Sequence, residues 1–319
     1  MSAKGLFSLT FARLNILRFQ YFSFIKKLKR LAKIMIKNLK TRNVYDREPS
    51  HYKFHNFRAF SNSGEILTEK FANRFETNST EIFKFRKLLK NQILIELSDK
   101  DFARLMPHLE FVSLAPGDEV YQPDEEMRYV YFPEDLVASQ LQGLSDGKTG
   151  ESAMIGSEGI IGLCAIFGFQ RQIQWTQITV GGNAWRIKTD VIKREFNQSA
   201  GIQASFLNFV NFLIAQVSQR AICNVHHLIE ERLCTWLLML DDRNKNKRLM
   251  LTQDQIANYL GVNRPSISHI AQNLREQGKI SYLRGQLHVI DKKGLQDSAC
   301  ECYAAIKDNI LSTECAQIM

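Results

Sequence analysis

The sequence predicts an α+β fold made of a β-roll, a long helix and a winged helix-turn-helix, in that order. Three stretches predict these parts. Short β-favouring runs alternate with turn residues between Phe111 and Ile187. Apolar residues recur in steps of three and four between Ile202 and Val225. The residues from Leu251 to Ile290 follow the pattern of helix, tight turn, helix and hairpin.

The length of 319 residues, 45% of them hydrophobic, suits two compact domains with separate cores. We expect a basic arm and linker over residues 1–78, poorly ordered, and a helical lead-in with the β-roll over 79–200. A dimerisation helix should follow at 201–226. The winged helix-turn-helix domain should occupy 227–319 and end in a helical tail.

The positive charge of the chain is concentrated at its beginning. Residues 1–42 hold eleven Lys and Arg and no acidic residue, so subtracting eleven from the net charge of +9 leaves −2 for the rest. Such a basic amphipathic stretch suits an anionic membrane or DNA phosphates. A poorly ordered arm, or upstream sequence translated from an early start codon, explains it equally. The overall basicity therefore does not by itself indicate that the folded part binds nucleic acid.

Several protein classes find no support in the sequence. No run of 18 uncharged apolar residues and no secretory signal appears, so we expect a cytoplasmic protein without stable membrane insertion. The six cysteines are scattered, as reduced thiols would be. A phosphate loop, a dinucleotide-binding glycine motif, a nucleophile elbow and paired metal-binding histidines are all missing in the right context, so we do not expect an enzyme.

The roll and its lead-in follow from local signals. Helical apolar spacing begins near Ser79, and Ser98 with Asp99 should cap the second lead-in helix. β-branched and aromatic residues then mark strands, for example Tyr129–Phe132, Val137–Leu141 and Trp175–Val180. So many short strands in under 80 residues are typical of a sandwich, roll or barrel.

The helix between Ile202 and Val225 is the predicted dimer contact. Steps of three and four are the seam along which a helix packs on a partner helix. The predicted seam consists of Phe206, Val210, Leu213, Val217 and Ala221. Because Leu207, Phe209 and Ile214 are also apolar, this helix can face both its own roll and a second subunit. The alternative is a helix packed only on its own roll.

The helix-turn-helix from Leu251 to Ile280 is the most specific signal in the chain. Thr252 should cap its first helix, Gly261 should supply the turn, and Ile267 should lie among the inward residues of the second helix. Donors and acceptors remain on the outer face, as a major groove requires. The candidate DNA-binding residues are Thr252, Asn263, Arg264, Pro265, Ser266, Ser268, His269, Gln272 and, at the tip of the following hairpin, Arg284.

These motifs resemble the Crp/Fnr superfamily of transcription regulators. The resemblance covers about Asn91 to Tyr303, with the roll opening LAPGDEVYQPDEEMRYVYFP and the segment GVNRPSISHIAQNLREQGKI among the best-matched pieces. It implies a roll like a cyclic-nucleotide-binding jelly roll, and a homodimer that binds an inverted repeat in double-stranded DNA. It also implies contact with RNA polymerase if the protein is an activator. Arg264 matches the family's first base-reading arginine, whereas Pro265 and His269 replace a glutamate and a second arginine of the cyclic-AMP receptor protein.

The roll departs from the cyclic-nucleotide binders of that family. Those proteins use a Gly-Glu pair on the ribose and an Arg-Ser or Arg-Thr pair on the phosphate; the matching positions here are Gly162-Leu163 and Gln172-Ile173. Arg171 lies one place out of register. A buried phosphate without its arginine is badly compensated, so we predict that cyclic AMP does not bind tightly, and no cofactor is identified.

Metal binding by the cysteines is a minor alternative at this stage. Iron-sulfur members of the family use N-terminal cysteines, and no cysteine precedes Cys164, so we expect no such cluster. Cys300, Cys302 and Cys315 allow a zinc or redox role but lack a fourth close ligand, so no metal site is predicted. His226 and His227 are assigned to interdomain packing or capping. The competing function is a ligand- or membrane-associated sensor whose winged domain mainly contacts protein; a further alternative is non-specific DNA binding by the basic arm.

Overall fold

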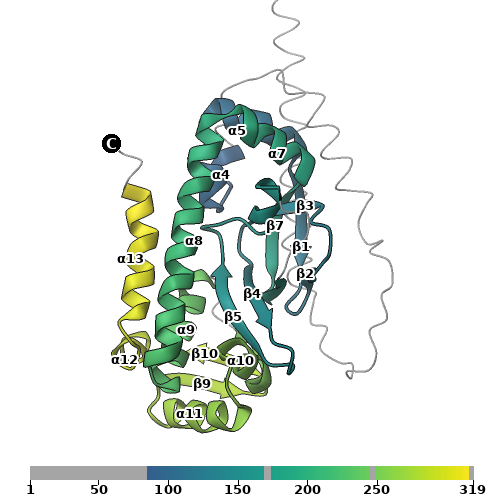
Figure 1. The fold of residues 1–319 in the computed structure, drawn as a ribbon. Helices are drawn as coiled ribbons and strands as arrows, with labels where there is room; N and C mark the ends of the chain where they lie inside the picture. Colours follow the sequence, from purple (N-terminus) through teal and green to yellow (C-terminus); the bar gives the residue numbers. More distant parts are fainter. Residues whose placement is uncertain (1–84, 169–173, 245–248, 316–319) are drawn as a thin grey trace, which may run out of the picture. The chain divides into compact units, whose positions relative to one another are not determined.

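The computed structural model describes residues 85–168, 174–244 and 249–315, all of which belong to one compact unit (Figure 1). The predicted arm at 1–78 lies outside these residues. The lead-in consists of α4 (Gln92–Glu96), α5 (Asp99–Leu105) and the 3-10 helix η1 (Met106–His108). Ser98 caps α5, since its side chain accepts a hydrogen bond from the Asp101 amide at 3.1 Å. The predicted cap is therefore confirmed.

Two antiparallel sheets form the roll. The first has the order β1-β7-β3 and the second the order β2-β6-β4-β5. Their strands are β1 (Glu110–Leu114), β2 (Glu119–Tyr121), β3 (Tyr129–Pro133), β4 (Val137–Gly143), β5 (Thr149–Ile155), β6 (Trp175–Val180) and β7 (Gly182–Lys188). The three strands named from the sequence are present, with β4 two residues longer than expected. Phe132, Leu136 and Ile178 are fully buried in the roll core, because alternate side chains of each strand face inward.

The long helix α8 (Ala200–His226) packs on the roll, preceded by the short α6 (Leu163–Ile166) and by α7 (Thr189–Gln198). Its Gln216 side chain is buried and bonds the backbone of Met154 on β5, accepting at 2.8 Å and donating at 3.2 Å. Since β5 is the last strand of its sheet, this side chain satisfies backbone groups that a neighbouring strand would otherwise pair.

The burial of α8 corrects one part of the predicted dimer seam. Phe206 is 0% exposed inside the core of its own chain, so it does not face a partner, and Leu213 packs against the same core. A helix with two apolar faces offers steps of three and four from more than one starting residue, and this is why the pattern misplaced Phe206. The exposed apolar positions begin one residue later. They are Leu207, Ile214, Val217, Ala221, Ile222 and Val225.

The length and composition of α8 would also allow a membrane span. That measure does not separate a core helix from a spanning one. The packing of Phe206, Phe209 and Phe212 in the core of the roll favours a core helix.

The winged domain begins at α9 (Ile229–Arg243) and contains the three-stranded sheet β8-β10-β9. Its remaining elements are β8 (Leu249–Met250), α10 (Gln253–Leu260), α11 (Arg264–Glu276), β9 (Ile280–Leu283), β10 (Gln286–Val289), α12 (Lys292–Asp297) and α13 (Cys302–Cys315). Helix α13 lies beside α8 (Figure 1). The predicted order of roll, long helix and winged helix-turn-helix is confirmed.

One hydrophobic core joins the winged domain to the roll. Trp236 and Leu237 of α9 belong to the same buried cluster as Met154 of β5 and Val137 of β4. Burial of apolar area stabilises at roughly 25 cal/mol per Å², so separating the domains exposes a costly surface. The recognition elements are therefore held in a defined place relative to the roll in this state.

Candidate nucleic-acid interface

The turn of the helix-turn-helix is built by caps on both sides. Thr252 accepts a hydrogen bond from the Gln255 amide at 3.2 Å, and Gln255 accepts one from the Thr252 amide at 2.8 Å. This reciprocal capping box fixes the start of α10. The helix ends at Gly261, whose φ of +65° lies in the left-handed region that glycine adopts without strain. Thr252 thus has the capping role that its sequence context predicts.

Asn263 fixes the start of the second helix. Its Oδ1 accepts from the Ser266 amide at 2.9 Å and from the Ser266 hydroxyl at 2.8 Å. Pro265 stands in the first turn of α11, where a missing amide proton leaves no helical hydrogen bond unmade. Inward, α11 buries Ile267, Ala271 and Leu274 against α10 and the wing. The first turn of α11 is thereby pointed outward by packing and by its cap.

The exposed side chains of α11 are the ones able to reach a base edge. Arg264 is 62% exposed and its Nε lies 3.6 Å from Asp254 Oδ1, an exposed ion pair that is worth little in water. His269 and Gln272 are exposed further along the helix. Gln272 donates to Glu276 at 2.8 Å. Arginine and glutamine are suited to bidentate contacts with guanine and adenine, respectively.

Two serines of the predicted set are less available than expected. Ser268 is half-buried and donates to Gln253 Oε1 at the start of α10. Ser266 is half-buried as well, and its hydroxyl is bonded to Asn263. Both hydroxyls therefore stabilise the helix pair here, because short side chains near a helix start bond the nearest polar group.

The wing is a tight hairpin between β9 and β10. Arg284 and Gly285 form its two-residue tip with φ values of +49° and +75°, which is the backbone of a type I′ turn. Arg284 is exposed there, as predicted. Beneath the tip, the Tyr282 hydroxyl donates to the Leu251 carbonyl at 2.8 Å, and burial raises the pKa of Tyr282 to about 12. The wing is thus tied to the residue that leads into α10.

A buried ion pair connects the roll, α8 and the winged domain. Glu151 of β5 accepts from the Trp236 indole at 2.9 Å and from the Ser139 hydroxyl, and it lies 3.4 Å from Arg220 of α8. The side chains of Glu151 and Arg220 are 0% and 6% exposed. Burial raises the pKa of Glu151, whereas Arg220 lowers it. No sequence signal marked these residues as partners.

A second polar contact lies beside it. The Tyr259 hydroxyl of α10 donates to Gln177 of β6 at 3.0 Å. Burial raises the pKa of this tyrosine to about 12. Helix α10 is therefore held against the second sheet of the roll by a side chain of its own.

The predicted ligand residues of the roll are only partly described. Gly162 precedes α6 with a φ of +88°, and a Cβ at this position would lie 2.3 Å from the Tyr121 hydroxyl. Leu163 is buried among apolar side chains. Arg171, Gln172 and Ile173 lie outside the described residues. Where the family's cyclic-nucleotide binders place a carboxylate, this chain thus has a buried leucine beside a buried tyrosine.

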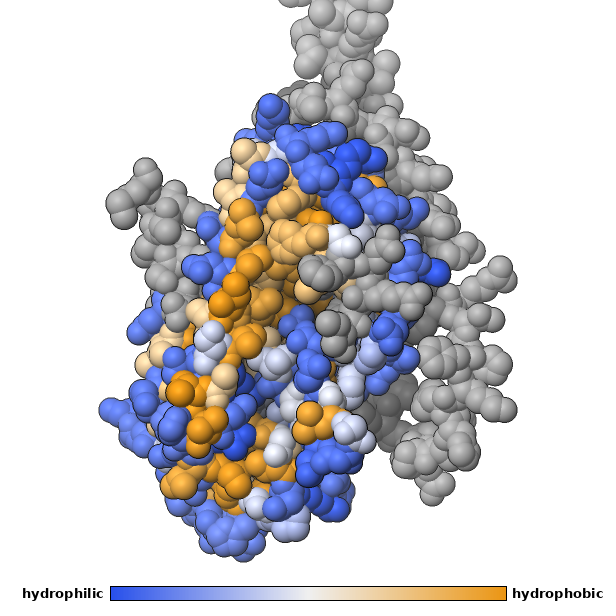
Figure 2. All heavy atoms as spheres, viewed as in Figure 1, coloured by the Kyte–Doolittle hydropathy of each residue, from blue (hydrophilic) through white to orange (hydrophobic). Residues whose placement is uncertain are grey.

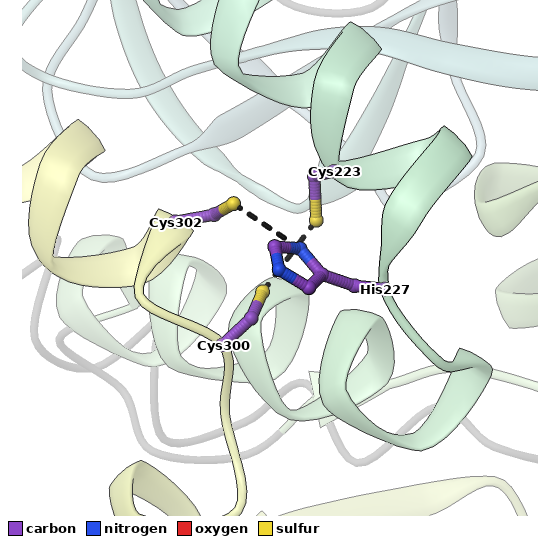
Figure 3. A group of neighbouring side chains, drawn as sticks. All are labelled: Cys223, His227, Cys300 and Cys302. Atoms are coloured by element: carbon purple, nitrogen blue, oxygen red, sulfur yellow. Dashed lines mark hydrogen bonds between the residues drawn. The ribbon is translucent and has the colours of Figure 1, made fainter.

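The structure also gathers three thiols and an imidazole at the end of α8 (Figure 3). This thiol–imidazole cluster consists of Cys223, His227, Cys300 and Cys302. Its four candidate ligand atoms all lie within 4.8 Å of one another. The hydrogen bond from Cys223 lowers the pKa of the Cys300 thiol.

The sequence analysis expected Cys300 and Cys302 to lack a fourth ligand, and it missed Cys223. The side chain of Cys315 lies outside the described residues. His227 does cap α8 through its backbone, as expected, but its ring also joins the thiols. The i, i+4 spacing of Cys223 and His227, together with Cys-x-Cys at 300–302, was the signal that could have found the cluster.

Comparison with known proteins assigns the winged domain. Residues 231–298 match the model of the Crp-like helix-turn-helix domain. No protein with curated annotation matches the chain.

Several solved structures share the fold. FixK2 from Bradyrhizobium japonicum is 17% identical with a TM-score of 0.52, over 60% of this chain and 98% of that one. A Crp/Fnr-family transcriptional regulator from Eubacterium rectale is 15% identical with a TM-score of 0.53, over 65% and 96%. The c-di-GMP responsive regulator CLP from Xanthomonas campestris is 12% identical with a TM-score of 0.50, over 60% and 99%. The resemblance read from the sequence is confirmed, and these relatives are regulators, not enzymes.

Proposed function

We propose that this chain, which combines the fold of the Crp/Fnr regulators with a Crp-like helix-turn-helix domain, is a sequence-specific transcription regulator that binds duplex DNA as a homodimer. The observation that carries the proposal is the outer face of α11. Its first turn presents Arg264 and Pro265, and its next turn His269 and Gln272, all exposed on a helix whose inner face is packed. A helix of this kind inserts its N-terminal half into the major groove.

The wing and the caps supply backbone contacts in this docking mode. Arg284 at the hairpin tip is an exposed cation at the end of a rigid turn, suited to a phosphate. Asn263 and the first amides of α11 present donors at a helix N-terminus, which favours an anion. Because Pro265 and His269 replace two base readers of the cyclic-AMP receptor protein, the operator should differ from that protein's operator.

The exposed stripe of α8 supports a homodimer. Figure 2 shows apolar side chains gathered along this helix. Leu207, Ile214 and Ala221 are spaced by seven residues, and Val210 and Val217 form the parallel row between them. That is the heptad pattern of a coiled-coil seam. Leu207 and Ile214 are 52% and 59% exposed in the single chain, and a second copy would remove this apolar area from water.

Two-fold symmetry of such a dimer requires an inverted-repeat operator, with half-sites about one helical turn apart. A signal received by the roll would act on the position of the recognition helices through α8 and the Glu151–Arg220 pair, as a shift between two arrangements. We infer that cyclic AMP is not this signal, because Leu163 leaves the ribose hydroxyl without a carboxylate.

Selection of bound sites from random duplex DNA tests the proposal. The full chain should enrich an inverted repeat, and the Arg264→Ala variant should lose about 1–3 kcal/mol of affinity for that repeat, roughly tenfold to a hundredfold. Arg128→Ala is the matched control, since Arg128 is an equally exposed arginine on the roll. Binding to a scrambled duplex should change little in either variant.

Three results separate the alternatives. Equal affinity of wild type and Arg264→Ala for every duplex would contradict recognition through α11. Loss of all binding on deletion of residues 1–42, with no enriched repeat, would assign DNA binding to the basic arm. No DNA binding at all, with a tight protein partner, would favour the sensor whose winged domain contacts protein.

A further inference from the structure

The thiol–imidazole cluster has the composition of a zinc site. Structural zinc is bound in proteins by four Cys or His ligands, and Cys₃His is one of the common sets. Two ligands come from the end of α8, where Cys223 and His227 lie one helical turn apart. The other two, Cys300 and Cys302, lie at the start of α13 and are far from the first pair in sequence. Nothing in the proposed DNA-binding function uses these residues.

The spacing of the ligand atoms fits one tetrahedral ion. With Zn–S near 2.3 Å and Zn–N near 2.0–2.1 Å, the edges of the tetrahedron are about 3.8 Å for S···S and about 3.6 Å for S···N. Cys223 Sγ lies 3.5 Å from Cys300 Sγ, and Cys302 Sγ lies 3.4 Å from His227 Nδ1. These distances are far longer than the roughly 2.05 Å of a disulfide. The atoms are thus separated as ligands of a shared ion are, and they converge on one point (Figure 3).

The surroundings supply the outer contacts that a zinc site needs. His227 points Nδ1 at the thiols and Nε2 at Glu301 Oε1, 3.3 Å away, and zinc-bound histidines commonly donate their other ring N–H to a carboxylate. The Thr235 hydroxyl lies 3.1 Å from Cys300 Sγ, and Gln219 donates to Cys302 Sγ at 3.1 Å. Such donors stabilise thiolates.

Charge and burial agree with that arrangement. Three thiolates around Zn²⁺ leave one negative charge, and Arg232 interacts electrostatically with Cys223 and Cys300. The three cysteine residues are 0–7% exposed, a burial that protects bound zinc from exchange with solvent. Three buried thiols without a metal would gain little from meeting at one point, since a thiol is only a weak hydrogen-bond donor.

We propose that the thiol–imidazole cluster binds one Zn²⁺ ion as a structural Cys₃His site. The ion replaces the thiol protons of three cysteines and takes the neutral imidazole of His227 through Nδ1. It joins the end of α8 to the start of α13, so that the C-terminal helix is clamped against the proposed dimer helix. The winged domain is thereby fastened to α8 from the side opposite to the Glu151–Trp236 contact.

Metal analysis of the full-length protein tests the site. Protein purified in the presence of reductant and without chelator should contain about one zinc per chain, and a thiol-reactive mercurial should release it. Cys302→Ser should lower the zinc content to less than about one fifth, whereas Cys164→Ser should leave it unchanged. Cys164 is the matched control because it is a free cysteine outside the cluster.

A second measurement does not depend on the folding of a variant. Wild-type protein stripped of metal and titrated with Co²⁺ should develop the visible absorption of tetrahedral, thiolate-bound cobalt, saturating at one equivalent and displaced by Zn²⁺. Stripping should also lower the thermal midpoint and expose the α12–α13 junction to protease. Zinc below about one tenth per chain with no cobalt–thiolate absorption, bound iron in place of zinc, or a Cys223–Cys300 disulfide in the reduced-purified protein would each overturn the proposal.

Because the metal content is measured without DNA, this test is independent of the proposed regulatory function. A zinc-containing protein that selects no DNA site would keep the inference and refute the function. A metal-free protein that selects an inverted repeat would do the reverse.

Discussion

Replacing Arg220 with methionine should leave the carboxylate of Glu151 buried without its cation. Met keeps most of the apolar stem of arginine, so the change removes charge with little loss of packing. The two side chains are 6% and 0% exposed, and removing one partner of a buried pair costs about 3–5 kcal/mol. Since Glu151 also holds Trp236, the loss should loosen the contact between roll and winged domain.

The size of this effect should depend on pH. Burial raises the pKa of Glu151, and Arg220 opposes that rise, so the pKa should be higher still in Arg220→Met. A carboxyl whose folded pKa is raised binds more protons folded than unfolded, so stability is retained below its ordinary pKa and lost as the pH rises through the folded pKa. The destabilisation should therefore be largest at neutral and alkaline pH and smaller near pH 5.

Urea unfolding at about pH 5 and about pH 8, at fixed protein concentration, measures both effects. The double variant Arg220→Met, Glu151→Gln should recover most of the loss, because the second change removes the buried charge. Arg128→Met breaks an exposed pair with Glu126 and should cost under about 1 kcal/mol. A loss below about 1 kcal/mol for Arg220→Met, or an equal loss at both pH values, would refute the assignment of a buried, charge-compensated Glu151.

Three further predictions follow from single positions. Ile214→Glu should raise the dimer dissociation constant at least a hundredfold in sedimentation equilibrium, because it puts two carboxylates in an apolar seam, whereas Leu88→Glu on another exposed apolar residue should not; an unchanged constant would move the interface off α8. Gly261→Ala should destabilise by about 1–2 kcal/mol in urea because φ is +65°, while Gly150→Ala, with open space around it, should cost less; equal losses would contradict the left-handed turn. Tyr259 should stay protonated to about pH 12 in an alkaline absorbance titration of the wild type, and Tyr259→Phe should remove that late step; the stability from this raised pKa is present below pH 10 and lost as the pH rises through about 12.

The helix-turn-helix was predictable because its signals are local. Thr252, Gly261 and Asn263 each act on backbone groups within four residues, through a cap or a permitted φ. Such effects depend on residue type and spacing, both of which are printed in the sequence. The wing tip at Arg284 and Gly285 is local in the same way.

Positions on α8 were harder to predict. Apolar periodicity shows that a helix has buried faces, but not which neighbour covers each face. Phe206 and Leu207 are adjacent and equally apolar, and only the position of the roll makes the first a core residue and leaves the second exposed. Ser268 was expected outside for a similar reason, since its bond to Gln253 depends on how α10 and α11 cross.

By itself the sequence determined the order of the elements, the caps and turns of the recognition motif, and the residue types on its outer face, because these depend on contacts between near neighbours. Only the tertiary structure decided which face of α8 is buried, that Glu151 pairs with Arg220 and Trp236, and that two cysteines at the start of α13 meet Cys223 and His227. Cys223 and Cys300 are 77 positions apart in the chain, and their separation of 3.5 Å arises from the packing of α13 along α8. No local pattern encodes such a meeting, because it depends on how every intervening element is packed.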